Sequence, residues 1–261
     1  MSGVAEGNGW LVRAQPNPSA RLRMLCFAYA GGGSSAFAGW AHDLPQDVEV
    51  CAVRLPGRES RILQQPYADL QELLPDLGDA AAPYCAEPFV LFGHSMGALI
   101  AFEYARWLRD TGRPDPRHLF VSGRRAPQLP HNRPLVHDLP AEDFVKQLWE
   151  LGGTPKELLT DPRVMRMVTP GLRADFQLND TYRYRRGPVL GCPISAFGGR
   201  TDPHVDQAGL TAWAHQSQSS FALHMMDGGH FFLHSARDAL LRKLAGTLWQ
   251  TMATGGETIV R

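Results

Sequence analysis

The sequence predicts an α/β fold with a mostly parallel central sheet and helices on both sides of it. Short apolar segments alternate with longer amphipathic ones, which is typical of parallel strands joined by helical crossovers. The short segments are mostly apolar throughout, as expected for strands that are buried on both faces. A length of 261 residues suits one domain with a full hydrophobic core.

The strands and helices can be placed in order along the chain. The expected strands are Leu22–Tyr29, Val48–Val53, Phe89–Gly93, His118–Ser122, Pro193–Phe197 and Ser220–Met226. A strong helix is expected from Ala98 to Arg109, where Gly112 and Pro114 stop it, and a terminal helix from about Ser235 to Met252. No internal repeat or low-complexity tract interrupts this series.

One interval is too long for a simple crossover. Roughly 70 residues separate Gly123 from Cys192, whereas a crossover needs only about a dozen. The interval contains two helical patterns, Ala141–Leu151 and Asp161–Leu178, so we expect a helical lid at about residues 127–186 within a single domain 1–261. Some of its apolar residues are expected to line an acyl channel, and the others to pack the lid onto the sheet. The apolar residues in question are Leu148, Trp149, Leu158, Leu159, Met165, Met167, Val168 and Phe176. Its internal joints are Gly152-Gly153, Pro155, Pro162 and Pro170-Gly171.

Composition excludes several classes of protein. The 26 basic and 26 acidic residues give zero formal charge, so no general attraction to nucleic acid or to an anionic membrane is expected. No apolar stretch approaches the roughly 18–20 residues that cross a bilayer, and Met1–Gly9 lacks the features of a signal peptide. The four cysteines are scattered, which indicates reduced residues in the core: Cys26, Cys51, Cys85 and Cys192. We therefore expect a cytoplasmic protein, and we expect it to be a monomer.

A pentapeptide between the third strand and the following helix carries the first sign of chemistry. Gly93-His94-Ser95-Met96-Gly97 matches the G-x-S-x-G nucleophile motif of α/β-hydrolases, in the strand–turn–helix setting that the motif requires. The turn is too tight for side chains at its flanks, which explains the two glycines. Ser95 then lies at a helix N-terminus, where partial positive charge favours a developing oxyanion.

A serine nucleophile needs a base, and His230 is the candidate. In this fold the base follows the last strand, and here Asp227-Gly228-Gly229-His230 provides a loop that can bend back toward Ser95. His234 and His224 are the rivals. The first is expected to open the terminal helix and the second to lie in a strand, so hydrogen-bonding structural roles fit both better.

The acid that orients the base is expected after the preceding strand. Asp202 lies there, 28 residues before His230, in the order serine, acid, histidine. Asp206 is the fallback, although it fits a helix start better. An acid after the earlier strand is excluded, because Ser122-Gly123-Arg124-Arg125 contains none.

Two backbone N–H groups are needed for the oxyanion hole. Met96, directly after the nucleophile, supplies one. The glycine-rich loop Ala30-Gly31-Gly32-Gly33 supplies the other, with Ala30 preferred and Gly31 next. This loop lacks the lysine of a phosphate-binding loop. No metal or cofactor is expected, because no H-E-x-x-H motif or cysteine pair accompanies the histidines of the C-terminal part: His204, His215, His230 and His234.

These residues resemble the discrete type II thioesterases of polyketide and nonribosomal peptide assembly lines, from about Leu22 to Leu248. The resemblance is carried by Phe27-Ala28-Tyr29-Ala30-Gly31-Gly32, Leu55-Pro56-Gly57-Arg58-Glu59, Phe92 to Ala98, Ser122-Gly123-Arg124-Arg125-Ala126-Pro127, Phe197-Gly198-Gly199 and Gly228-Gly229-His230-Phe231-Phe232. The chain departs from the family at Tyr29, where a histidine is usual, so the pocket is expected to differ beside the oxyanion loop.

The resemblance implies hydrolysis of aberrant or stalled acyl groups from the phosphopantetheine arm of acyl carrier or peptidyl carrier domains, in antibiotic biosynthesis. It implies the discrete type, because Arg124-Arg125 replaces an acid, the chain starts with Met1, and no carrier domain is attached. Carrier domains are commonly acidic, so arginines near the entrance are candidates for docking: Arg124, Arg125, Arg173, Arg183, Arg185 and Arg186.

Three alternatives remain open from the sequence. An esterase acting on a free small molecule would share the triad. An acyltransferase would pass the acyl group from the enzyme to an alcohol or amine instead of water, and acyl-CoA is a further possible donor. A catalytically dead binding module would usually have lost a triad residue, whereas this chain has candidates for all three.

Overall fold

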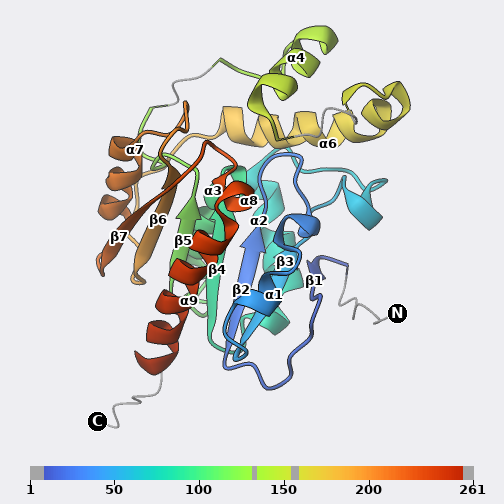
Figure 1. Ribbon diagram of the computed structural model, residues 1–261. Coiled ribbons are helices and arrows are strands. Elements are labelled where there is room, and N and C mark those ends of the chain that lie inside the picture. The colour runs from blue at the N-terminus through green and yellow to red at the C-terminus, as the bar shows by residue number, and fades with distance from the viewer. Residues whose placement is uncertain (1–8, 131–133, 154–158, 255–261) are drawn as a thin grey trace.

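A seven-stranded sheet forms the centre of the molecule (Figure 1). The computed structural model describes residues 9–130, 134–153 and 159–254. The strands are β1 (Leu11–Val12), β2 (Leu22–Phe27), β3 (Val48–Val53), β4 (Phe89–His94), β5 (Leu119–Ser122), β6 (Ile194–Gly199) and β7 (Phe221–Met226). Their order is β1-β3-β2-β4-β5-β6-β7, and only β1 is antiparallel to its neighbour. The α/β-hydrolase prediction is therefore confirmed; β1 was missed because two residues carry no pattern.

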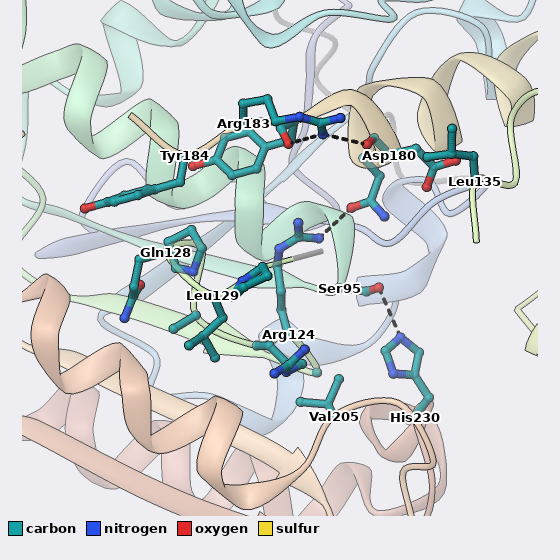
Figure 2. Close-up of a pocket in the computed structure, with 17 residues that line it drawn as sticks. Ser95, Arg124, Gln128, Leu129, Leu135, Asp180, Arg183, Tyr184, Val205 and His230 are labelled. Carbon is teal, nitrogen blue, oxygen red and sulfur yellow. Dashed lines mark hydrogen bonds between the residues drawn. The ribbon is translucent and has the colours of Figure 1, made fainter. Parts of the chain in front are cut away.

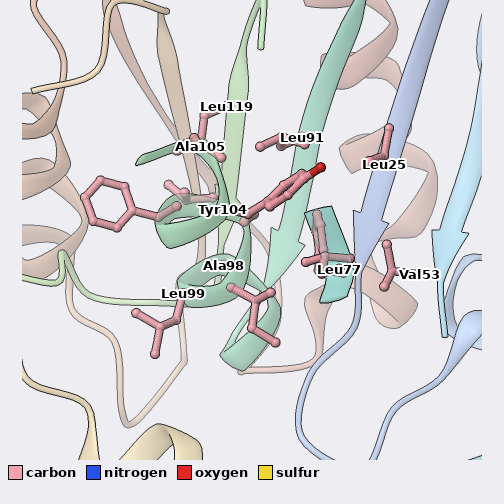
Figure 3. Packing of buried hydrophobic residues seen from close by; sticks show 14 of the residues in the cluster. Leu25, Val53, Leu77, Leu91, Ala98, Leu99, Tyr104, Ala105 and Leu119 are labelled. Carbon is pink, nitrogen blue, oxygen red and sulfur yellow. The ribbon is translucent and has the colours of Figure 1, made fainter. Parts of the chain in front are cut away.

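Helices cover both faces of the sheet, as the apolar strands require. Successive residues of β2 point to opposite faces: Leu25 packs in the core with α2 (Leu70–Ala81) and α3 (Met96–Asp110), as Figure 3 shows. Met24 packs in the core on the other face, with α1 (Trp40–Asp43), α8 (Phe232–Ser235) and α9 (Arg237–Thr254). The predicted terminal helix corresponds to α9, whereas the short α8 before it and α2 are helices that the sequence prediction omitted.

Capping residues set the starts of several helices. Asp69 accepts a hydrogen bond from the N–H of Gln71 and opens α2. Asp206 accepts one from the N–H of Gly209 at 2.8 Å and opens α7 (Gln207–Thr211), which confirms the helix-start interpretation of this residue. Short 3₁₀ helices occur at Ser34–Phe37, Glu59–Arg61, Ala82–Tyr84 and Ala212–Gln216.

The segment predicted as a lid contains α4 (Ala141–Leu151) and α6 (Pro162–Thr181). Both lie together beyond one end of the sheet (Figure 1). Asp161 caps α6 and Pro162 occupies its first turn, where a missing N–H costs nothing. Pro155 and Leu158 lie outside the described residues. The helices match their predicted ranges closely, and their action as a lid stays a prediction.

A buried histidine gives the fold a testable pH dependence. His118 is 7% exposed, bonds the Ser195 hydroxyl at 2.9 Å and stacks on Phe120, and burial lowers its pKa to about 4. Between pH about 4 and 6.5 the unfolded chain therefore binds a proton that the folded chain does not, so stability is lost as pH falls through this window. The loss from this group is on the order of 3 kcal/mol at most.

We expect His118→Gln to flatten this acid loss, because the amide can still bond Ser195 but does not titrate. Urea unfolding at pH 7, 5.5 and 4 measures the effect. His215→Gln, at an exposed position, is the control for the exchange of a histidine for an amide. An equally steep acid loss in His118→Gln would contradict the assignment.

Candidate active site

The turn between β4 and α3 holds Ser95 in a strained backbone conformation. Its φ of 55° and ψ of −114° are unusual for a residue with a side chain. A Cβ on Gly93 would overlap the carbonyl oxygen of Gly97, and a Cβ on Gly97 would overlap that of Phe27, so both glycines are sterically required. Met96 is the first residue of α3, and its N–H therefore has no acceptor within the helix.

Three side chains from three loops meet at this turn. The Oγ of Ser95 lies 3.0 Å from Nε2 of His230 (Figure 2), and Nδ1 of His230 lies 2.7 Å from Oδ2 of Asp202. A carboxylate can only accept, so Nδ1 carries the proton and Nε2 is left to accept from the serine hydroxyl. The other oxygen of Asp202 accepts the N–H of His204 at 2.8 Å. The structure thus brings together the three residues that the sequence predicted.

The surroundings of the site keep Asp202 ionised and the neighbouring His94 neutral. Burial by itself raises the pKa of the Asp202 carboxyl, but the hydrogen bond and charge of His230, with the N–H of His204, outweigh it and leave the pKa below its ordinary value. Asp202 therefore stays ionised at neutral pH. His94, whose ring lies 5.2 Å from that of His230, has its pKa lowered by burial and then by the neighbouring histidines. It stays neutral and bonds the hydroxyl of Ser122 at 2.9 Å.

The rival histidines have structural roles. His224 lies in β7 and stacks on Phe197, with ring centroids 4.9 Å apart. His234 lies in α8, and its Nε2 is 3.1 Å from the hydroxyl of Tyr29. Tyr29 also packs edge-on against Phe231, next to His230, so the residue that departs from the family pattern contacts the loop of the base.

The glycine-rich loop after β2 forms a tight turn. The N–H of Gly32 donates to the carbonyl of Tyr29 at 2.8 Å, which leaves Ala30 and Gly31 as the central residues. Gly31 has a φ of 76°, a value that favours glycine at the third position of such a turn. Its N–H donates to Asp175 at 2.7 Å. Since the N–H of Gly31 is engaged, the geometry favours Ala30 as the second oxyanion donor.

A cavity of about 610 Å³ opens beside Ser95 and His230 (Figure 2). Its walls are largely polar and come from the loop after β5 and from the end of α6 with the residues that follow. Arg124 from the first wall bonds Asn179 from the second at 2.5 Å. Further lining side chains include Arg125, Gln128, Leu129, Leu135, Asp180, Tyr182, Arg183, Tyr184 and Val205.

The apolar lid residues largely pack against each other instead of lining this cavity. Phe144 and Leu148 of α4 form a separate core with Leu159 and with residues of α6 such as Met165. Val168 and Phe176 are partly buried against that core, whereas Trp149 and Met167 are about half exposed. The expectation of an apolar channel formed by these residues is not supported, because none of those that the structure describes lines the cavity.

Three of the six candidate arginines line the cavity, namely Arg124, Arg125 and Arg183. Arg173 instead ties α6 to the segment before α4, because it donates to the carbonyls of His137 and Leu139 at 2.6 and 2.9 Å. The remaining two, Arg185 and Arg186, are exposed and not among the lining residues.

Among the residues that the structure describes, no group of three His, Cys, Asp or Glu side chains could hold a metal ion. Within the same residues, no helix has the length and apolar character needed to cross a membrane.

Comparisons with known proteins identify chains that are similar over nearly the whole length. The model of the "Thioesterase domain" family matches residues 23–248. The gramicidin S biosynthesis protein GrsT of Aneurinibacillus migulanus is 41% identical over 97% of this chain and 99% of its own length. Thioesterase PikA5 of Streptomyces venezuelae is 33% identical over 97% of this chain and 90% of its own. The structure of BorB, a type II thioesterase from the borrelidin biosynthetic cluster, superimposes with a TM-score of 0.84 at 35% identity, over 95% of this chain and 99% of its own.

Proposed function

Since the chain belongs to the thioesterase family and is a hydrolase of thioesters, we propose that it is a type II thioesterase that clears aberrant or stalled acyl groups. The groups would be carried on the phosphopantetheine arm of acyl carrier or peptidyl carrier domains. The observation that carries the chemistry is the chain of contacts from Ser95 through His230 to Asp202, with distances of 3.0 and 2.7 Å. The relatives from gramicidin S biosynthesis and from the borrelidin biosynthetic cluster support the choice of substrate.

The proposed reaction has two half-reactions. Nε2 of His230 takes the proton of Ser95 while Oγ attacks the thioester carbonyl, and the oxyanion is met by the N–H groups of Met96 and Ala30. The carrier thiol leaves readily, because its pKa is near 8.5. Water, activated by His230, then attacks the acyl-serine and releases a carboxylic acid. Asp202 stabilises the imidazolium that forms in each half-reaction.

The cavity supports the carrier-bound substrate. It begins at Ser95 and has arginines and amides on its walls, which suits the amide and phosphate groups of a phosphopantetheine arm better than a long hydrocarbon chain. Arg125 and Arg183 line the cavity and would supply positive charge to an acidic carrier domain at its mouth. Four free, buried cysteines fit a reducing compartment, and we propose that the enzyme acts in the cytoplasm, as a monomer.

Substrate comparison separates this function from the alternatives. Turnover is to be measured for the same acyl group on a carrier protein, on coenzyme A and on a p-nitrophenyl ester, with and without an added alcohol or amine. We expect the highest kcat/KM for the acyl-carrier, and free acid as the product. A preference for the free ester, or transfer of the acyl group to the added nucleophile, would contradict the proposal in favour of an esterase or an acyltransferase.

Charge removal at the cavity tests the docking part. Arg125→Gln and Arg183→Gln are each expected to raise KM for an acyl-carrier several-fold with kcat nearly unchanged, because exposed ion pairs contribute about 0.2–1 kcal/mol. The same variants should keep the wild-type KM for a p-nitrophenyl ester. Arg242→Gln, at an exposed position of α9, is the matched control. Unchanged KM for the acyl-carrier in both variants would exclude these arginines from docking.

A further inference from the structure

The motif Leu55-Pro56-Gly57-Arg58-Glu59 follows β3 but supplies none of the triad residues. Its Arg58 side chain is buried and reaches across to the glycine-rich loop after β2. There Nη1 donates to the carbonyl of Gly32 at 2.8 Å, and Nη2 donates to Oδ1 of Asp175 at 2.6 Å. The motif therefore links the oxyanion loop to helix α6.

Asp175 completes the link from the side of α6. It is 2% exposed, and its second oxygen accepts the N–H of Gly31 at 2.7 Å. Both carboxylate oxygens thus accept a hydrogen bond, one from the guanidinium of Arg58 and one from the backbone N–H that follows Ala30. The helix also approaches the motif closely, because a Cβ on Gly171 would lie 2.7 Å from the carbonyl oxygen of Gly57.

The 3₁₀ helix Ser34–Phe37, which directly follows the loop, is held by the next residue of the motif. Glu59 accepts hydrogen bonds from the hydroxyl of Ser34 at 2.6 Å and from the N–H of Ser35 at 3.2 Å. A loop with three consecutive glycines has little conformational preference of its own. Its shape must therefore be imposed by partners, and the described partners are Arg58, Glu59 and Asp175.

We propose that Asp175 is a positioning residue for the oxyanion hole, and that through it the seating of α6 determines whether the hole is assembled. The proposal rests on the proposed function, since it assigns Ala30 as a donor. With the N–H of Gly31 tied to the carboxylate and the carbonyl of Gly32 tied to Arg58, the peptide between Tyr29 and Ala30 keeps one orientation. Displacement of α6 would remove Asp175 from both Gly31 and Arg58, so the loop would lose one tie directly and the support of Arg58 in the other.

A buried ion pair suits this task because it is specific and not because it is strongly stabilising. Desolvation offsets much of the attraction between two buried charges, so a packed apolar pair would stabilise the fold as well. An apolar pair could not accept the N–H of Gly31. The carboxylate of Asp175 holds the N–H of Gly31, and the guanidinium of Arg58 holds the carbonyl of Gly32. One donor and one acceptor of the loop are therefore both fixed.

Asp175→Asn tests the proposal, because an amide can satisfy either Gly31 or Arg58 but not both. Oxyanion contacts are made in the transition state, so their misplacement lowers kcat without weakening substrate binding. We expect kcat to fall about 10- to 100-fold, less than the loss of a whole oxyanion donor, with KM within about twofold of wild type. The substrate is a p-nitrophenyl ester or a small acyl thioester, so that carrier docking plays no part.

Glu49→Gln is the matched control. Glu49 is also a buried carboxylate, 1% exposed, that accepts one backbone N–H, from Asn17 at 3.0 Å. It also pairs with Arg13 and Arg23, both at 3.1 Å, and lies in β3 away from the oxyanion loop. The control should lose thermal stability like Asp175→Asn but keep the wild-type kcat at temperatures where it is folded.

Hydrogen exchange gives a readout that does not depend on activity. In Asp175→Asn, peptides covering residues 29–35 should exchange faster than in wild type, while peptides from β4 keep their protection. If Asp175→Asn does not fold, Arg58→Lys replaces it. Lysine carries its donors on a single nitrogen, so it does not reproduce the contacts that the two guanidinium nitrogens make with Gly32 and Asp175, and a smaller loss of kcat at constant KM is expected.

Two results would overturn the proposal: a wild-type kcat in a folded Asp175→Asn or Arg58→Lys enzyme, or an equal loss of kcat in Glu49→Gln. Failure of the proposed function is recognised separately. A wild-type enzyme that hydrolyses the small substrate but not acyl-carriers would refute the carrier assignment and leave the role of Asp175 measurable.

Discussion

Replacement of Ser95 by alanine is expected to abolish thioester hydrolysis, with a loss of kcat on the order of 10⁶ by analogy with other serine hydrolases. The hydroxyl is the only group at this turn that can attack and carry the acyl chain, and its contact with His230 at 3.0 Å has no substitute in the variant. Alanine keeps the Cβ and the same strained φ, so the fold and the cavity should be unchanged.

Steady-state turnover of an acyl-carrier, thermal unfolding and intact-mass analysis together test this expectation. Wild type incubated with a p-nitrophenyl ester should show a mass increase of one acyl group, and Ser95→Ala should show none. Near-normal turnover in a clean Ser95→Ala preparation, or an acyl adduct on that variant, would refute Ser95 as the nucleophile.

The second large effect is expected from Asp202→Asn, at about 10⁴ in kcat by analogy with other triads. Asparagine fills the same space, but its amide can donate to Nδ1 of His230. The ring then carries its proton on Nε2, which can no longer accept from Ser95. Because the pKa of Asp202 lies below its ordinary value, the wild-type carboxylate is ionised throughout the neutral range. The loss should therefore be similar at pH 6.5 and at pH 8.

Asp206→Asn is the control for this variant. Asparagine caps helices about as well as aspartate, so α7 should keep its start and the enzyme its activity. Single-turnover measurements with a small thioester distinguish the two variants without carrier docking. A benign Asp202→Asn and a crippling Asp206→Asn would show that the wrong carboxylate was assigned.

Local pattern in the sequence determined the sheet, the turn at Ser95 and the order of the triad residues. Apolar strand segments and the helix after Gly97 are set by neighbours in the chain, so their ranges were predictable to within a few residues. The two glycines of the turn are required by overlaps with nearby backbone. In this fold the triad residues lie in loops after particular strands, and once the strands were placed, Asp202 and His230 followed from position alone.

Only the tertiary structure decided how α6 meets the oxyanion loop and what lines the cavity. Asp175 is separated from Arg58 by 117 residues and from Gly31 by 144, and such pairs produce no periodicity or spacing that a sequence can display. For the same reason the apolar residues of the lid could not be divided between a channel and a separate core. That division depends on which face of each helix meets the sheet, and this is settled by packing between segments that lie far apart in the chain.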